Sequence, residues 1–170
     1  DEATNGFITT AEVKKRLKDS KLEPMGKPLS AVNAREIEQM LEQSAFVKKA
    51  ECSKTMDGTV NISVTQRMPV VRIKSLNGED YYVDDKDCVM PNSRYTSDLI
   101  IATGCISRSF ATRYVSPLAR TINESDFWRN QIVQINILPD HSVELVPRVG
   151  DHIVNIGALP MYRDTETRHK

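Results

Sequence analysis

Two short segments near the start of the chain have the apolar spacing of amphipathic helices, and each follows a capping residue. In the first, Thr9 can cap the amide of Glu12, and the helix is predicted to end near Asp19. In the second, Asn33 is the cap. Its apolar stripe is formed by Ile37, Met40, Leu41 and Ala45. Prolines and a glycine between Leu22 and Ser30 predict a loop between the two helices.

After the second helix the apolar period changes from that of a helix to that of a strand. A strand is predicted over Val47 to Thr55, followed by a hairpin turn at Asp57-Gly58. From Val60 to Val64 apolar and polar residues alternate, as in a sheet with one buried face. A two-stranded hairpin is a poor sheet, so we expect a third strand from the residues before Ile8 or from upstream.

Pro69 marks an edge strand or the end of this ladder, and beyond it strands dominate. Asn77-Gly78 predicts a second hairpin turn. Ser116-Pro117 is predicted to open a helix that reaches about Ile122, and residues 125–130 form another helical turn. Strands are predicted over residues 70–75, 81–83, 88–90, 99–103, 132–138, 142–146 and 152–156.

The distribution of charged residues indicates a domain boundary and argues against a nucleic-acid partner. Residues 1–70 carry 11 Lys and Arg against 10 Asp and Glu, and residues 71–170 carry 12 against 13. Neither half is basic, so no nucleic-acid partner is predicted. Lysine dominates the first half and arginine the second. We therefore expect one domain over residues 1–70, a second over 71–162, and a polar, frayed tail over 163–170.

Membrane and redox signals are weak in this sequence. No run of about 18 apolar residues occurs, so no membrane-spanning helix is predicted in this chain. The chain starts at Asp1, and any membrane anchor is expected upstream of it. The three cysteines, Cys52, Cys88 and Cys105, are too few for a disulfide scaffold. One bridge plus a free thiol, or three buried thiols, both fit the sequence.

Residues with catalytic or metal-binding chemistry are scattered. Asp84, Asp85 and Asp87 form the densest acidic cluster, but the central glycine and distal glutamate of a calcium loop are missing. We interpret the cluster as a solvated turn. The histidines and cysteines lack metal-ligand spacing, and nucleophile and phosphate-loop motifs do not occur. No catalytic, cofactor-binding or metal residue is predicted.

Trp128 could serve as an interface anchor. It is followed by Arg129, and both residue types are common at binding hot spots. The alternative is that Phe127 and Trp128 pin a short helix onto the core, which we expect for Phe127. An open sheet edge could also accept a strand from a partner.

The chain from Phe46 to Val70 resembles the strand, glycine turn and strand of a POTRA module, the polypeptide-transport-associated domain. Its second strand, VNISVTQRMPV, is similar to the family pattern l-x-I-x-V-x-E-R-x-P-V. Residues 81–91 resemble the segment yyvD-x-x-G-x-v-P, which follows POTRA in the FtsQ/DivIB family of bacterial cell-division proteins. That similarity continues through residues 127–132 and 143–150. Gln66 departs from the pattern by replacing an acidic residue, and Asp87-Cys88 stands where glycine is usual.

The resemblance implies an α+β protein, with a POTRA-like helix-helix-hairpin module followed by a mainly antiparallel β domain with short helices. It implies a non-enzymatic scaffold of the divisome that lies outside the cytoplasm and is tethered to the inner membrane by an upstream helix. The implied partners are FtsB-like and FtsL-like division proteins and upstream recruiting factors. The family adds a helix and further strands near the point where this chain ends, and these hold much of the partner surface.

Five residues are the partner-binding candidates that follow from this reasoning. Arg67, Pro69 and Val70 mark the hinge between the modules, and Trp128 and Arg129 precede a strand of the second module. One alternative keeps the POTRA module in an outer-membrane assembly or secretion system. The other is a cysteine-dependent enzyme, which would need a histidine beside one of the thiols.

Overall fold

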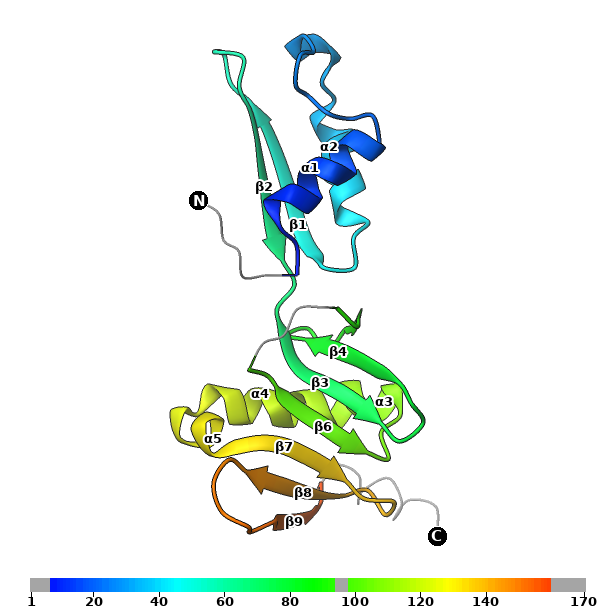
Figure 1. The fold of residues 1–170 in the computed structure, drawn as a ribbon, viewed down its shortest axis with the longest axis vertical. Helices are drawn as coiled ribbons and strands as arrows, with labels where there is room; N and C mark the ends of the chain where they lie inside the picture. Colours follow the sequence, from blue (N-terminus) through cyan, green and yellow to red (C-terminus); the bar gives the residue numbers. More distant parts are fainter. Residues whose placement is uncertain (1–6, 94–97, 160–170) are drawn as a thin grey trace. The chain divides into compact units, whose positions relative to one another are not determined.

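The computed structural model describes residues 7–93 and 98–159 of the 170-residue chain. The described part divides into two compact units, and the division falls between Arg67 and Met68. Figure 1 shows helices and a hairpin in the first unit and a larger sheet with helices in the second. The predicted α+β class, with mainly antiparallel strands, is confirmed.

The first unit begins with two capped helices. The hydroxyl of Thr9 accepts a hydrogen bond from the amide of Glu12 (3.2 Å), and the side chain of Asn33 accepts one from Glu36 (3.3 Å). Each cap satisfies an amide that has no partner inside its helix. The elements of this unit are α1 (Thr10–Asp19), the 3-10 helix η1 (Leu29–Ala31), α2 (Ala34–Glu42), β1 (Val47–Lys54) and β2 (Val60–Gln66).

The two strands of this unit form an antiparallel hairpin, and both helices lie on one of its faces (Figure 1). Apolar side chains from the helices and strands bury together as one small core. Its buried members are Ile8, Leu17, Val32, Ile37, Leu41, Val47 and Ala50. The expected third strand before Ile8 falls on residues that lie outside the described part of the chain.

Gln66 closes the first unit by fastening its two ends together. Its side-chain carbonyl accepts hydrogen bonds from the amides of Phe7 (2.8 Å) and Ile8 (3.4 Å), and its NH2 group donates to the carbonyl of Ile8 (3.1 Å). The rings of Phe7 and Phe46 stack at 5.4 Å, and the amide of Arg67 donates to the carbonyl of Phe46. A carboxylate could not donate to Ile8, so glutamine at this position makes a contact that the usual acidic residue cannot.

A seven-stranded mixed sheet forms the second unit. Its spatial order is β5-β4-β3-β6-β7-β8-β9, with parallel pairs only at β3-β6 and β6-β7 among the described residues. Helices connect the parallel strands β6 and β7, as a crossover requires. The strands are β3 (Pro69–Ser75), β4 (Asp80–Asp84), β5 (Val89–Pro91), β6 (Ile100–Gly104), β7 (Ile132–Ile137), β8 (Ser142–Pro147) and β9 (Val154–Ala158).

The helix near Ser116 differs from the prediction. Helical structure begins at α3 (Arg108–Phe110), capped by Ser107, and continues through a π-helix η2 (Ala111–Val115) into α4 (Ser116–Glu124). Ser116 is therefore an interior residue, and it makes no cap. A proline inside a helix clashes with the carbonyl of the preceding turn, and the wider π turn before Pro117 relieves that clash.

One apolar core lies between the helices and one face of the sheet. Val71, Ile73, Ala102, Ile135 and Ile137 are almost fully buried on the strands. Phe110, Ala111, Val115, Ala119 and Ile122 are the helical members. Gly104 permits the close approach of β6 and β7, because a Cβ there would lie 2.1 Å from the carbonyl oxygen of Ile137, and its φ is +105°.

The acidic turn after β4 is ordered and partly buried, so its interpretation as a solvated turn is wrong. Asp84 is only 3% exposed and accepts hydrogen bonds from the amides of Lys86 and Cys88. Asp87 accepts from the hydroxyl of Ser116 (2.8 Å) and pairs with Arg120 (3.1 Å). Asp87 has a φ of +58°, so aspartate takes the left-handed conformation for which the family uses glycine. The carboxylates thus hold the turn in place.

Candidate partner-binding surface

A short helix, α5 (Asp126–Gln131), presents two aromatic side chains to solvent. Ser125 caps it by accepting from the amide of Trp128. Phe127 is 62% exposed and Trp128 49% exposed, and their rings meet edge to face at 5.0 Å. The expectation that Phe127 pins the helix onto the core is wrong. Neither ring enters the core, because Ile132, the residue after the helix, takes the buried position at this end of the sheet.

Arg129 of this helix and Arg148, which follows β8, line a common hollow. Arg129 pairs with Asp126 (2.6 Å) one turn away in a solvent-exposed contact, which contributes little to stability. With Arg148, Arg129 lines a shallow hollow at the start of β6 and β7. The other lining residues are Asp98, Leu99, Ile100, Ile101, Asn123, Ile132 and Val133. The hollow combines apolar walls with guanidinium groups, a pattern suited to apolar and acidic side chains of a peptide.

The last described strand, β9, continues this surface. The amide of Arg148 donates to the carbonyl of Gln131 (2.6 Å), which joins the end of β8 to the end of α5. Four large apolar residues beyond Arg148 are exposed, whereas Leu159 packs against the core. The four are Val149, Ile153, Val154 and Ile156. We call the exposed residues of α5, the β8-β9 turn and β9 the α5-β9 surface.

β9 is also the terminal strand of the sheet. Among residues 98–159 it pairs only with β8, so its other edge carries backbone groups without a ladder partner. Side chains on both faces of β9 are exposed, and Ile156 is 43% exposed. An apolar terminal strand of this kind is a template for pairing with another chain.

The remaining predicted candidates lie at the boundary between the units. Arg67 ends the first unit, and its guanidinium donates to the carbonyl of Ala45 (2.8 Å). Pro69 begins β3 and lies opposite Asp84. The carbonyl of Val70 accepts from the side chain of Asn123 (3.1 Å), and its side chain packs against the core of the second unit. These contacts fix each residue within its own unit.

In the described part of the chain, no cluster of His, Cys, Asp and Glu is suited to a metal ion. The three cysteines are free thiols, and burial raises the pKa of the Cys52 thiol. A raised thiol pKa lowers the thiolate fraction at neutral pH, which is unfavourable for a nucleophile. Within the same described residues, no helix has the length and apolar character needed to cross a membrane.

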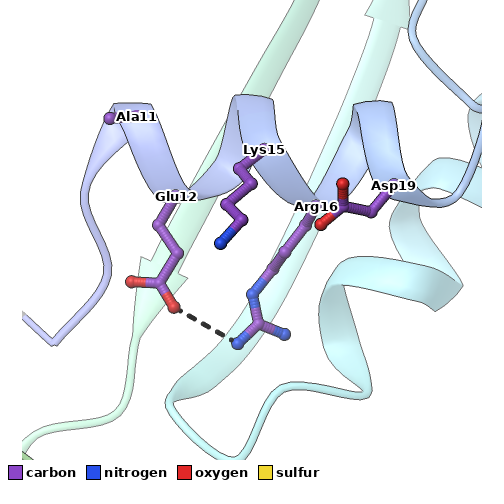
Figure 2. A pocket seen from close by; sticks show the side chains of 5 residues that line it. All are labelled: Ala11, Glu12, Lys15, Arg16 and Asp19. Atoms are coloured by element: carbon purple, nitrogen blue, oxygen red, sulfur yellow. Dashed lines mark hydrogen bonds and ion pairs between the residues drawn. The ribbon is translucent and has the colours of Figure 1, made fainter.

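The other surface hollows have a different character. Figure 2 shows one that is lined only by side chains of α1, with Glu12 and Arg16 joined by an ion pair (3.4 Å). A groove lined by a single helix is open to solvent and gives no enclosed pocket.

Sequence reasoning located Trp128 and Arg129 but missed most of the α5-β9 surface. Ile153, Val154 and Ile156 were predicted only as part of a strand. Their alternation with polar residues signals a strand but does not reveal that the strand is terminal. Sheet order decides this, and Arg148 likewise joins the surface only through its backbone contact with α5.

Comparisons with known proteins agree with the two units. A model of the POTRA-like domain matches residues 1–65. A model of the family described as FtsQ/DivIB, C-terminal related, matches residues 68–168. The comparison with curated proteins gives no match.

Proposed function

Because the chain belongs to the FtsQ/DivIB C-terminal related family and carries a POTRA-like domain, we propose that it docks partner division proteins on its α5-β9 surface. FtsQ/DivIB is a non-enzymatic family of cell-division proteins, and its related domains lie outside the cytoplasm. The observation that carries the proposal is the exposed, apolar strand β9, which ends the sheet in the described part of the chain, together with the exposed aromatic side chains and Arg129 of α5.

Docking would proceed by addition of a partner strand to β9. Main-chain hydrogen bonds along the edge supply affinity for any extended segment, and side-chain contacts supply selectivity. Val154 and Ile156 offer exposed apolar contacts on the strand. Arg129 and Arg148 favour a partner segment with acidic residues next to its apolar ones.

The proposed partners are FtsB-like and FtsL-like division proteins, together with upstream recruiting factors. The proposed tether is an inner-membrane helix upstream of this chain. Arg67, Pro69 and Val70 are proposed as the hinge, since the boundary between the two units falls among them. The proposed domains are a POTRA-like domain over residues 1–70 and an FtsQ-type β domain over 71–162, with a polar tail over 163–170.

A role in an outer-membrane assembly or secretion system is the alternative. It rests on the POTRA-like match over residues 1–65 alone. It gives no account of residues 68–168, which match the FtsQ/DivIB model. The division role explains both matches and is therefore preferred.

Two substitutions test the docking surface. Arg129→Glu reverses a charge beside the hollow, and Ile156→Lys places a charge on the terminal strand, a device that blocks edge pairing. We expect each to weaken capture of the FtsB-like partner at least about tenfold, as for a well-placed interface residue. The melting temperature should stay within a few degrees, because both side chains are exposed.

The matched control is Arg113→Glu, which makes the same charge change on an exposed position of η2. Partner capture by this variant should equal that of the unmodified chain. Unchanged capture by both Arg129→Glu and Ile156→Lys, with the fold intact, would exclude the α5-β9 surface as the docking site.

A further inference from the structure

Lysine side chains cover one face of α1 in the first unit. Lys14, Lys15, Lys18 and, just beyond the helix, Lys21 are exposed. At 100° per residue the three helical lysines fall within an arc of about 100°. Within the described residues none of these four ammonium groups takes part in an ion pair or a side-chain hydrogen bond. The face therefore concentrates positive charge, and Asp19 lies at its margin, one turn after Lys15.

Three nearby acidic side chains are engaged by other groups. Glu12 pairs with Arg16, and Figure 2 shows Lys15 and Asp19 lining the same hollow as this pair. On the neighbouring helix, Glu38 and Glu42 accept hydrogen bonds from amides of β1. Glu12, Glu38 and Glu42 are thus committed to local contacts, whereas Asp19 and the lysines are exposed to solvent.

The loop after α1 carries an exposed apolar side chain. Met25 is 79% exposed. The ammonium group of Lys27 donates to the carbonyl of Lys21 (2.9 Å), which holds the loop against the end of α1. Exposed lysines on a helix, followed by a loop with an exposed flexible apolar side chain, are the elements of an interfacial contact with lipid headgroups and the upper part of the acyl chains.

We propose that this face of α1, together with Met25, binds an anionic phospholipid surface. Lysine is a flexible point charge suited to a diffuse anionic layer, whereas recognition of a defined carboxylate favours the planar fork of arginine. The hollow on α1 is lined by α1 alone and offers no groove for an acidic peptide. The nearby edge of β1 is engaged by Glu38 and Glu42 and offers no strand-pairing site at those amides.

Co-sedimentation of the whole chain with lipid vesicles tests the proposal. Vesicles of phosphatidylcholine with about 30% phosphatidylglycerol supply the anionic surface, and pure phosphatidylcholine vesicles are the neutral comparison. We expect binding only to the anionic vesicles, with a marked decline when the salt concentration rises from about 0.05 to about 0.5 M. The double substitution Lys15→Glu/Lys18→Glu should lower the partition coefficient about tenfold or more.

The matched control is Lys74→Glu/Lys86→Glu, which makes the same change of net charge at exposed positions of the second unit. This control should retain binding. Equal loss in both double variants would show that net charge alone matters and would overturn the assignment to α1, as would equal binding to neutral vesicles. Binding to soluble polyglutamate but not to anionic vesicles would also overturn it, in favour of an acidic protein partner. The test is independent of docking on the α5-β9 surface, because Arg129→Glu and Ile156→Lys lie outside this face.

Discussion

Two of the terminal strands, β1 and β9, differ in how their outer edges are treated. On β1 the outward amides of Ala50 and Cys52 donate to the carboxylates of Glu42 (3.1 Å) and Glu38 (2.8 Å) from α2. On β9 the side chains of Val154 and Ile156 are exposed, and β8 is its one sheet partner in the described part of the chain. The outer edge of β1 is thus blocked by α2, whereas no described residue pairs with the outer edge of β9.

This difference between the two edges indicates which of them is the better candidate for strand addition by a partner. A carboxylate that accepts from an edge amide occupies the position that a neighbouring strand's carbonyl would take, so it prevents strand addition there. Among the described residues no such acceptor lies on the outer edge of β9, so β9 is a stronger candidate than β1 for strand addition.

The largest effect on the free energy of unfolding is expected from a substitution that disrupts the sheet to which β9 belongs. Gly104→Val places side-chain atoms against the carbonyl of Ile137 in a left-handed backbone position, so we expect a cost of about 3 kcal/mol or more. Urea unfolding measures this cost. Gly78→Ala, which has a φ of +88° but open space around it, is the control and should cost only about 1 kcal/mol. Equal costs for the two variants would contradict the packing argument.

Opening the edge of β1 should have the next largest effect. Glu38→Leu removes the acceptor of the Cys52 amide, and we expect the free energy of unfolding to fall by about 2 kcal/mol. Hydrogen exchange at Cys52 should quicken, and self-association at high protein concentration should increase. Glu36→Leu, an exposed position on the same helix, should change neither quantity. Unaltered exchange at Cys52 in Glu38→Leu would show that the carboxylate does not protect the edge.

A smaller effect is expected at the opposite end of the seven-stranded sheet. The hydrogen bonds from Arg72 lower the pKa of Asp80, so the charged form is favoured in the folded state. That stability is present above the ordinary pKa of 3.8 and is lost as the pH falls through the lowered folded-state pKa. Asp80→Asn should cost about 1 kcal/mol at pH 7 and progressively less in acid. A cost that is independent of pH would contradict the ion-pair origin.

The smallest effect is expected at Tyr81, on the same strand. Its hydroxyl is buried without a hydrogen-bond partner among the described residues, and burial raises its pKa from 10.0 to about 12. Tyr81→Phe should therefore be neutral or stabilising by up to about 1 kcal/mol at pH 7. The unmodified protein should lose stability between pH 10 and 12, because only its unfolded state ionises there, and Tyr81→Phe should lose less. A destabilised variant at pH 7 would indicate a bound water at this hydroxyl.

Local signals in the sequence predicted local structure well. Thr9 and Asn33 marked two helix starts, because capping depends only on neighbouring residues. Features set by distant contacts were missed. The sequence predicts a helix that opens at Ser116, whereas helical structure begins at Arg108. The π turn before Pro117 has no simple sequence pattern that would reveal this earlier start.

The candidate site shows the same limit. Trp128 and Arg129 were found from residue type, but the exposure of Phe127 was not, because a short aromatic helix can face either way. Val154 and Ile156 became candidates only once the order of the seven strands placed them at the edge. Sequence pattern indicates which face of a strand is apolar, and the tertiary fold determines which strand has no neighbour.

The contacts of Gln66 also have a mechanical consequence. Phe7 and Arg67 stand at the two ends of the first unit, yet both are fastened to the same small group of residues, Gln66 and Phe46. A pulling force applied between those ends would act across a few parallel hydrogen bonds and one ring stack. The helices and the hairpin, which lie between Phe7 and Arg67 in the sequence, would not carry this force while those contacts hold. The first unit could therefore transmit a moderate load along the chain while α1, α2 and their core stay folded.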